Sequence, residues 1–375
     1  MGARRVAAAL LLVAAAAGTA YAAQDQAAGA LPFAELARRA SAAWAAGRND
    51  EAQRWFEQGV ERDPAWDEGW WYLGSIHYEA DRYADARVAF AHVTRLKPEA
   101  SPAWAMLGLT EYRLGELDAA LQHLMRWQTI GPGGDNEISR TAGLHLAMLL
   151  VRSGQFDLAM RPLTWLASAH QETPELSLLC GLVIQERALL PAEVPPADRE
   201  RTVAIGHAAF SALGGRDAEA KSRFEEVIAR YPNVRGVRYA YGLVLSRMGS
   251  ADALPALRRE VELFPDDVHA HLQIALELLG RGQAKEALPS AQEAVRLAPD
   301  LFAAHLALGR ALVETGTLGE GTAHLERAAE LAPDVADIYL ALARAYALAG
   351  RTADVERMRA KMIETERKRQ PQLHP

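Results

Sequence analysis

Three histidines have the spacing that comes closest to a metal site. His271 and His305 are 34 residues apart, and His269 lies two positions before the first of them. A metal could bridge the pair, since imidazole is a common zinc ligand, but a stable site needs three or four ligands. The spacing fixes no third ligand, and both histidines fall where helices are expected to pack. We therefore predict packing residues and no bound metal.

Motifs for nucleophilic and phosphate chemistry are missing from the sequence. The single cysteine, Cys180, stands in an apolar segment, which is typical of a small buried side chain. The glycine-rich run at residues 131–134 lacks the lysine and hydroxyl residue that complete a phosphate loop. Neither a His-Glu-x-x-His helix nor a Gly-x-Ser-x-Gly turn occurs. We predict no catalytic residue and no cofactor.

Aromatic residues, in contrast, recur at a regular interval and could contact a partner. Trp44, Tyr78 and Tyr112 follow one another at intervals of 34 residues. Trp71 and Ser75 share a helical stripe with Tyr78, because their spacing places them on one side of a helix. Such rings with polar tips are favoured at protein interfaces. The alternative is that they only pack against one another along the chain.

Two arginines are expected to flank this aromatic stripe, namely Arg82 and Arg113. A neighbouring stripe carries Trp70, Leu73 and His77, and we expect it to be buried between helices. In the carboxy-terminal half the places equivalent to the aromatic stripe are Leu279, Val313 and Ala347. A contact surface there would be smoother and more aliphatic, so an aromatic contact is expected in the amino-terminal half.

Prolines at a fixed interval mark the unit that must position these residues. They occur at Pro64, Pro98 and Pro132, and again at Pro232, Pro265, Pro299 and Pro333. Intervals of 33 or 34 residues indicate one repeated structural unit. A glycine or aspartate lies near the middle of each unit, where two helices would turn: Gly47, Asp81, Gly115, Gly154, Gly215, Gly249, Gly282, Gly316 and Gly350.

The clearest copy resembles the tetratricopeptide repeat. It runs Trp70-x-x-Leu73-Gly74, then Ala86-x-x-x-Phe90 and a closing proline, and departs from the pattern with His77 in place of tyrosine. The resemblance implies an all-α fold, an α-solenoid or right-handed superhelix of about nine stacked helix-turn-helix units. It also implies that the stripe containing Trp71 lines a concave groove.

Domain boundaries follow from where the repeat pattern is regular and where it fails. Between Pro132 and Pro232 the pattern weakens, and a fifth unit has a first helix but no clear second one. Three prolines then interrupt the chain. We predict a signal segment, an amino-terminal repeat block, a proline-rich interruption, a carboxy-terminal repeat block and a charged capping helix with a tail: residues 1–22, 32–190, 191–200, 201–350 and 351–375.

Charge and composition limit the class of partner. The formal net charge is -7, with acidic and basic residues interleaved, which disfavours nucleic acid as a ligand. The leading function is an interaction scaffold for a protein or peptide ligand, in keeping with cell-envelope assembly by exported members of the family. A carbohydrate-binding or enzymatic solenoid and a self-assembling structural rod are the alternatives. The oligomeric state is left open.

The amino terminus has the order of a secretory signal. Arg4 and Arg5 precede an apolar run at residues 6–17, and Ala20-Tyr21-Ala22 supplies small residues at a cleavage position. The protein is therefore expected to be exported, periplasmic or secreted, without a membrane span in the mature chain. An uncleaved anchor helix is the alternative, although the apolar run is shorter than the roughly 20 residues that span a bilayer.

Cleavage after Ala22 can be tested directly. Amino-terminal sequencing of protein from its native host should give a mature chain that begins at Ala23, because signal peptidases cut behind small residues. Intact protein that begins at Met1 and stays in the cytosol would contradict export. Intact protein in the membrane fraction would instead show the anchor alternative.

Overall fold

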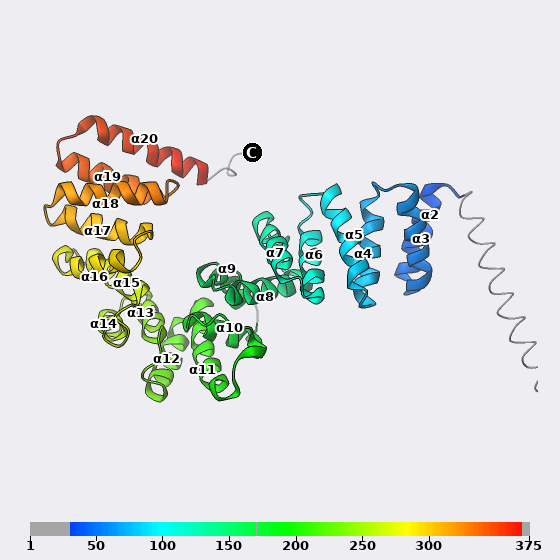
Figure 1. Ribbon diagram of the computed structural model, residues 1–375, viewed down its shortest axis with the longest axis horizontal. Coiled ribbons are helices and arrows are strands. Elements are labelled where there is room, and N and C mark those ends of the chain that lie inside the picture. Colours follow the sequence, from blue (N-terminus) through cyan, green and yellow to red (C-terminus); the bar gives the residue numbers. More distant parts are fainter. Residues whose placement is uncertain (1–30, 170, 370–375) are drawn as a thin grey trace, which may run out of the picture. The chain divides into compact units, whose positions relative to one another are not determined.

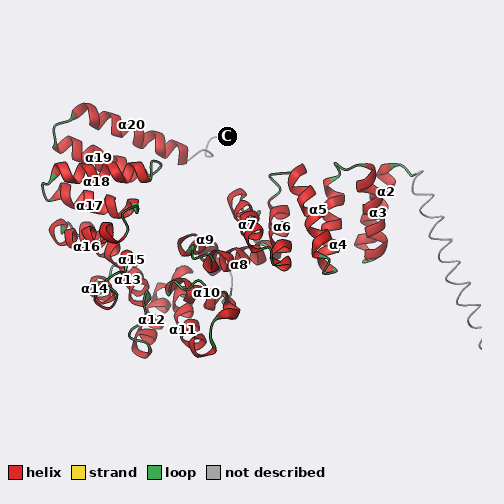
Figure 2. Ribbon diagram, viewed as in Figure 1, coloured by secondary structure: helices red, strands yellow, loops and turns green. Residues whose placement is uncertain are grey.

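The computed structural model describes residues 31–169 and 171–369, so the predicted signal segment 1–22 and the end of the predicted tail lie outside the described residues. Within the described ranges the chain contains nineteen α-helices, one 3-10 helix and no strand (Figure 2). This confirms the predicted all-α class. Among these helices, none has the length and apolar character needed to span a bilayer.

The chain forms two compact units that divide after Leu149, within helix α8. In the first unit, helices follow one another as antiparallel pairs (Figure 1). The pairs are α2 (Phe33–Ala45) with α3 (Asn49–Arg62), α4 (Asp67–Glu79) with α5 (Tyr83–Leu96), and α6 (Ser101–Leu114) with α7 (Leu117–Ile130), followed by α8 (Glu137–Arg152).

The second unit begins less regularly and then returns to paired helices. Its first elements are α9 (Phe156–Ala169), α10 (Pro174–Ile184) and the 3-10 helix η1 (Pro191–Glu193). The pairs that follow are α11 (Pro196–Leu213) with α12 (Asp217–Arg230), α13 (Val237–Arg247) with α14 (Ala253–Leu263), α15 (Val268–Gly280) with α16 (Ala284–Leu297), α17 (Phe302–Glu314) with α18 (Leu318–Leu331), and α19 (Ala336–Leu348) with α20 (Thr352–Arg369).

The predicted turn positions adopt the left-handed backbone that a tight connection between helices requires. Gly115, for example, ends α6 with φ 79°, a region that glycine enters without steric cost. Asp81 occupies the equivalent turn of the preceding pair with φ 57°. The turn therefore forces a reversal at a fixed place in each unit, and the helix pair follows from it.

Close packing within a pair explains why the repeat pattern contains a glycine and a large apolar residue. A Cβ atom on Gly74 would lie 2.7 Å from the Phe90 ring, and one on Gly108 would lie 2.7 Å from Leu124. Both of these large side chains are fully buried. The glycine of the first helix thus makes the space that the large residue of the second helix fills.

A repeated hydrogen bond closes the junction before the first helix of the regular repeats. Trp70 Nε1 donates to the carbonyl oxygen of Pro64 at 3.0 Å, six residues earlier, and the proline is the one that follows the preceding helix pair. The same bond is made by Trp104 to Pro98, Arg238 to Pro232, His271 to Pro265, His305 to Pro299 and Tyr339 to Pro333. Ser139 makes a similar bond to Pro132.

The proline-rich segment 191–200, predicted as the boundary between two repeat blocks, lies inside the second compact unit. The single helix α10 packs directly on α11. Their crossing is very close, because a Cβ atom on Gly206 would lie 1.6 Å from the Ser177 carbonyl oxygen and one on Gly181 would lie 2.0 Å from that of Thr202. The prolines therefore lie in the connection between two helices that pack closely on each other.

The α10–α11 crossing predicts a large effect of one methyl group. Gly206→Ala should lower the free energy of unfolding by about 2 kcal/mol or more, because the new Cβ atom meets backbone that cannot rotate away. Gly280→Ala is the matched control, since nothing lies within 4 Å of its Cβ position, and it should be neutral or stabilise by up to about 1 kcal/mol. Urea unfolding monitored by circular dichroism measures both. Equal stability of the two variants would contradict the close crossing.

Candidate functional site

The first unit contains a recess lined by three aromatic rings, which we call the aromatic recess. It encloses about 510 Å³ and lies between α4 and the junction of α5 with α6. The rings belong to Trp66, Trp71 and Tyr72. The remaining lining residues are Asp67, Glu68, Val93, Lys97, Ala100, Pro102 and Ala103. Trp71 was predicted from the sequence as a contact residue, whereas Trp66 and Tyr72 were not.

Two glycines hold the ring of Trp66 in place. A Cβ atom on Gly59 would lie 2.3 Å from this ring and one on Gly69 would lie 2.4 Å from it, so the indole fits only because both side chains are absent. Trp66 also packs on the ring of Phe56, with 5.6 Å between centroids. The recess therefore has a rigid wall, which is the condition for binding without a large entropy cost.

The other two rings are fixed from different sides. Trp71 meets the buried ring of Phe90 edge-on, with 5.6 Å between centroids. Tyr72 stacks on Phe56 at 4.9 Å and contacts Trp44 at 5.7 Å. The predicted contact residue Trp44 thus supports the recess from behind through Tyr72. Both Trp71 and Tyr72 remain partly exposed.

The charged groups at the aromatic recess leave one carboxylate free. Lys97 Nζ lies 2.5 Å from Asp67 Oδ2, so these two charges compensate each other. Glu68 is exposed and has no ion-pair partner among the described residues. The recess can therefore accept an apolar or aromatic group together with a hydrogen-bond donor or a cation.

The remaining residues of the predicted aromatic stripe make local contacts. Ser75 Oγ donates to the carbonyl oxygen of Trp71 at 3.0 Å, one turn earlier on the same helix. Tyr78 packs on Tyr83 of α5 at 5.4 Å, and burial raises the pKa of its phenol. Tyr112 packs on His145 of α8 at 4.4 Å. The structure thus places Trp44, Tyr78 and Tyr112 in three separate ring contacts and not in one stacked strip.

The two predicted flanking arginines lie in different places. Arg113 lies over the ring of Tyr83, 4.9 Å from its centroid, and 3.7 Å from Asp81, so it does accompany the Tyr78 contact. Arg82 instead donates to Gln53 Oε1 at 2.6 Å and lines another recess, next to His77. The side chain of Arg82 thus leaves the turn toward α3.

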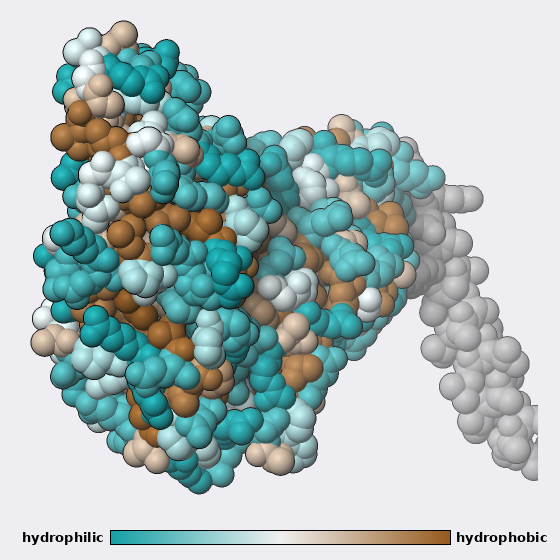
Figure 3. All heavy atoms as spheres, turned by 60° about the vertical axis from the view of Figure 1, so that its left-hand side comes forward, coloured by the Kyte–Doolittle hydropathy of each residue, from teal (hydrophilic) through white to brown (hydrophobic). Residues whose placement is uncertain are grey.

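The equivalent places in the second unit are mostly buried. Leu279 and Val313 are buried and Ala347 is exposed. An aliphatic surface does exist nearby, where Leu276, Leu306 and Leu340 line a groove of about 580 Å³. Figure 3 shows hydrophobic residues exposed between hydrophilic ones along this part of the chain. The expected residue Val313 also lines this groove, whereas Leu276, Leu306 and Leu340 lie three, seven and seven residues before the expected places.

The histidines considered as metal ligands take part in the junction between units. His271 Nε2 and His305 Nε2 each lie 2.9 Å from a proline carbonyl oxygen, to which each donates. His305 Nδ1 also lies 2.9 Å from His324 Nδ1. In the described part of the chain, no group of three or more His, Cys, Asp or Glu residues is placed to hold a metal ion.

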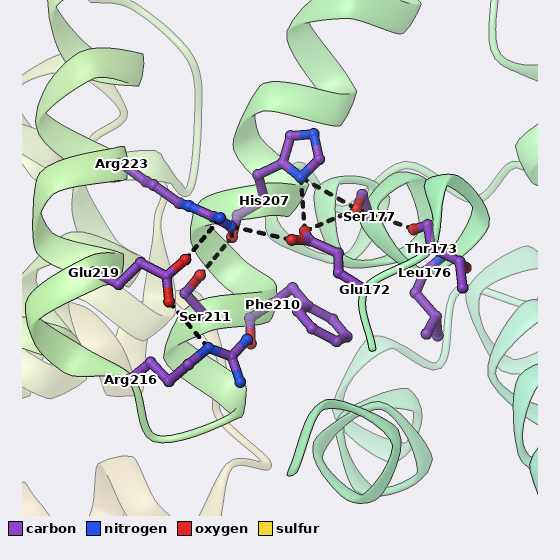
Figure 4. A network of polar contacts seen from close by, with 10 residues as sticks. All are labelled: Glu172, Thr173, Leu176, Ser177, His207, Phe210, Ser211, Arg216, Glu219 and Arg223. Carbon is purple, nitrogen blue, oxygen red and sulfur yellow. Dashed lines mark hydrogen bonds and ion pairs between the residues drawn. The ribbon is translucent and has the colours of Figure 1, made fainter. Parts of the chain in front are cut away.

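A serine, a histidine and a glutamate meet where α10, α11 and α12 join, an arrangement that the sequence analysis missed (Figure 4). Glu172 Oε1 accepts hydrogen bonds from Ser177 Oγ at 2.9 Å and His207 Nδ1 at 2.7 Å. Arg223 Nη1 donates to Glu172 Oε2 at 3.2 Å and to the His207 carbonyl oxygen at 2.9 Å. His207 and Arg223 are 35 and 51 residues away from Glu172 in the sequence, so no local motif indicates that these residues meet.

The geometry of this network differs from that of a nucleophilic site. In a catalytic triad the histidine uses one ring nitrogen for the serine and the other for the carboxylate. Here the same nitrogen, Nδ1 of His207, faces both Glu172 at 2.7 Å and Ser177 at 3.4 Å. Ser177 is also fully buried. Burial raises the pKa of Glu172, but the hydrogen bonds from His207, Ser177 and Arg223 lower it below its usual value, so the network holds a charged carboxylate that ties three helices together.

The environment of the single cysteine disfavours its thiolate form. Cys180 is buried in α10, and burial raises the pKa of its thiol to about 12. A nucleophilic or metal-binding cysteine needs the thiolate form at neutral pH. The predicted packing role of Cys180 agrees with this environment.

Comparison with protein families assigns the repeat. The family model described as tetratricopeptide repeat matches residues 37–93, 78–135, 249–301, 272–334 and 306–354, more than half of the chain. The chain belongs to the tetratricopeptide-repeat family. The matches fall on regular helix pairs in both units and leave residues 136–248 unmatched, where the sequence pattern weakens.

Several solved structures are similar over less than half of the chain. A MamA structure from Desulfovibrio magneticus RS-1 is 22% identical, covering 45% of this chain and 96% of its own, with a TM-score of 0.42. YrrB, described as a TPR protein with an unusual peptide-binding site, is 20% identical, covering 47% of this chain and 92% of its own, with a TM-score of 0.41. No curated protein matches.

Burial of His145 beneath Tyr112 makes stability depend on pH. Burial lowers the pKa of His145 below 6.5 and the charge of Arg113 lowers it further, against a hydrogen bond to the Thr141 carbonyl oxygen. A histidine whose pKa is depressed on folding binds protons more readily in the unfolded chain. The contribution of His145 to the free energy of unfolding is therefore complete above the ordinary pKa of histidine. It is lost as the pH falls from there through the lowered pKa of the folded state.

The free energy of unfolding should accordingly decrease between about pH 7.5 and about pH 5.5. His145→Leu should lose less over the same interval, because leucine keeps the apolar contact with Tyr112 but does not titrate. Burial also lowers the pKa of His77, His92 and His324, so part of the pH dependence will persist in the variant. Urea titrations at both pH values measure the difference, and identical losses for the two proteins would exclude His145 as a contributor.

Proposed function

We propose that this protein is a non-catalytic interaction scaffold that binds a peptide segment of a partner protein, with the aromatic recess of the first unit as its anchor site. The observation that carries the proposal is the convergence of Trp66, Trp71 and Tyr72 around about 510 Å³ of open space. A few residues carry most of the affinity at protein interfaces, and tryptophan and tyrosine are enriched among them.

Family membership supports the same function. Tetratricopeptide repeats stack helix pairs into extended surfaces that contact other proteins, and each repeat needs its neighbours for stability. Fixed rings in the recess offer contact area at low entropic cost, and Glu68 adds one free acceptor beside them. The geometry of the Ser177, His207 and Glu172 network and the high pKa of Cys180 support a role without catalysis.

The cellular setting that we propose is the cell envelope. The support is the order of charged, apolar and small residues at positions 1–22, which is typical of exported proteins. In this setting the scaffold would be periplasmic or secreted and would take part in cell-envelope assembly. Its partner would be another exported protein with an accessible segment that carries an apolar or aromatic side chain.

Trp71 is the residue to change first. Photo-crosslinking from a benzoylphenylalanine at position 68 in the native host identifies the partner, and titration calorimetry with a peptide from its crosslinked segment gives the affinity. Trp71→Ala should weaken binding of that peptide at least about tenfold, since loss of an aromatic anchor costs about 2 kcal/mol. The unfolding curve should change little, because the ring is only partly buried.

Trp55→Ala is the matched control, since Trp55 is also partly buried but lies on α3 and does not line the recess. It should leave the affinity unchanged. Equal affinity of the Trp71→Ala and unmodified proteins would place the binding surface elsewhere. Retention on a glycan array that is lost in Trp71→Ala would instead favour the carbohydrate-binding alternative.

A further inference from the structure

The second unit contains a larger cavity with different chemistry, which we call the acidic cavity. It encloses about 690 Å³, against about 510 Å³ for the aromatic recess. Four helices contribute to it: the start of α9, the end of α10, α13 and the start of α15. The lining residues used below are Phe156, Asp157, Glu186, Tyr239, Asp267 and His269.

The cavity exists because α10 has no second helix of its own. The chain leaves α10 at Ile184, and the first turn of α13 approaches this end directly. Gly236 permits the approach, because a Cβ atom there would lie 1.9 Å from the Ile184 carbonyl oxygen and its φ is 80°. The end of α10 and the first turn of α13 thus form one wall of the cavity.

Aromatic faces form one part of the lining. The ring of Tyr239 lies 5.9 Å from that of His269, and Phe156 lines the cavity as well. Burial raises the pKa of Tyr239 to about 12, so its phenol stays neutral at any physiological pH. The faces of Tyr and Phe rings attract cations through their quadrupole.

Three carboxylates form another part of the lining and make it acidic. Asp157 is exposed and has no ion-pair partner among the described residues. Glu186 lies 3.9 Å from His269 Nε2, and Asp267 accepts a hydrogen bond from the backbone N–H of Ala270 at 2.9 Å. All three act on Tyr239, since their charges raise the pKa of its phenol in addition to burial.

The one arginine in the lining does not cancel these charges. Arg235 forms an ion pair with Asp266, which is not a lining residue, and lies over the ring of Phe264, 5.2 Å from its centroid. The cation is therefore already paired, and the cavity keeps a negative balance. A positively charged group would find both carboxylates and aromatic faces there.

Glu186 is the residue whose placement is most unusual. It follows α10 with φ 50°, a left-handed conformation that disfavours every residue with a Cβ atom. In most comparable turns of the chain, Gly115 among them, glycine takes this place. A glutamate at this place puts a carboxylate at the cavity but strains the backbone. Glu186 is therefore the most informative residue to change.

We infer that the acidic cavity binds a lysine or arginine side chain of a partner peptide. Charge complementarity selects the cation, since carboxylates form strong charge-assisted hydrogen bonds with ammonium and guanidinium groups. The rings of Tyr239 and Phe156 select a long side chain that can lay its cationic end against an aromatic face. This site goes beyond the aromatic recess, because it lies in the other unit and selects by charge.

Fluorescence polarisation with the full-length protein tests the inference. The probe is a fluorescein-labelled, amidated Gly-Arg-Leu-Arg-Gly peptide, compared with the same peptide containing citrulline or glutamate in place of arginine. The arginine peptide should bind, and the other two should bind at least about tenfold more weakly, because they lack the cation. Absence of binding by the arginine peptide, or equal binding of the citrulline peptide, would overturn the inference.

Charge-removing variants locate the site. The double variant Glu186→Gln with Asp157→Asn should weaken the arginine peptide at least about tenfold, since the shape is kept and two charges are lost. Glu262→Gln on α14 is the matched control, because this exposed glutamate is paired with Arg259 and does not line the cavity. It should bind like the unmodified protein. Equal affinity of the double variant would show that the peptide binds elsewhere.

Glu186→Gly separates a binding role from a structural one. Glycine relieves the backbone strain, so the melting temperature should rise or stay the same while affinity for the arginine peptide falls. A lower melting temperature with unchanged affinity would mean that Glu186 serves only the fold. Trp71→Ala should bind the arginine peptide normally, so failure of this inference and failure of the proposed function can be told apart.

Discussion

The hydrogen bond from the first helix of a unit to the preceding proline carbonyl is the interaction on which the regular part of this structure depends. Neighbouring repeats share no covalent constraint beyond the chain, and each buries its apolar face only against the next. A side-chain donor six residues after the proline binds the proline carbonyl oxygen and so fixes the direction in which the next helix begins. Tryptophan, arginine, histidine and tyrosine all supply it, as Trp70, Arg238, His305 and Tyr339 show. Each bond contributes only about 1 kcal/mol, but it recurs at successive junctions.

This constraint decides which residues are left for function. The residue that donates the hydrogen bond, such as Trp70, faces the junction. The next two residues on the same helical stripe, Leu73 and His77, are buried in the core. None of these three side chains is free to contact a partner. Contact with a partner therefore falls to the next position along the helix. That position carries Trp71 in the first unit and Tyr239 in the second, and each lines a cavity. The same constraint explains why His271 and His305 are poor candidates for metal ligands, since their Nε2 atoms are already donors.

The sequence is informative where the chemistry is local to one repeat. The glycine of the first helix and the large residue of the second meet within a single pair, so Gly74 with Phe90 predicts the fold directly. It is less informative where a contact depends on distant backbone. Trp66 was missed because its ring is held between two glycines outside the repeat pattern, Gly59 and Gly69. The contact of Arg82 could not be read from the sequence, because a long side chain next to a turn can leave it toward either neighbour, and the partner Gln53 is on another repeat.

The break in the repeat around α10 shows how a solenoid gains specificity. Regular units have similar neighbours and so present similar surfaces, which suits stability but not discrimination between ligands. Where α10 packs on α11 without a second helix, two arrangements appear that occur once in the described chain: the Glu172 network and the acidic cavity. The first ties α10, α11 and α12 together through the partly buried carboxylate of Glu172. The second lies beside the end of α10, where backbone hydrogen bonds from Glu186 and Arg187 to Val183 and Leu182 hold the left-handed conformation of Glu186.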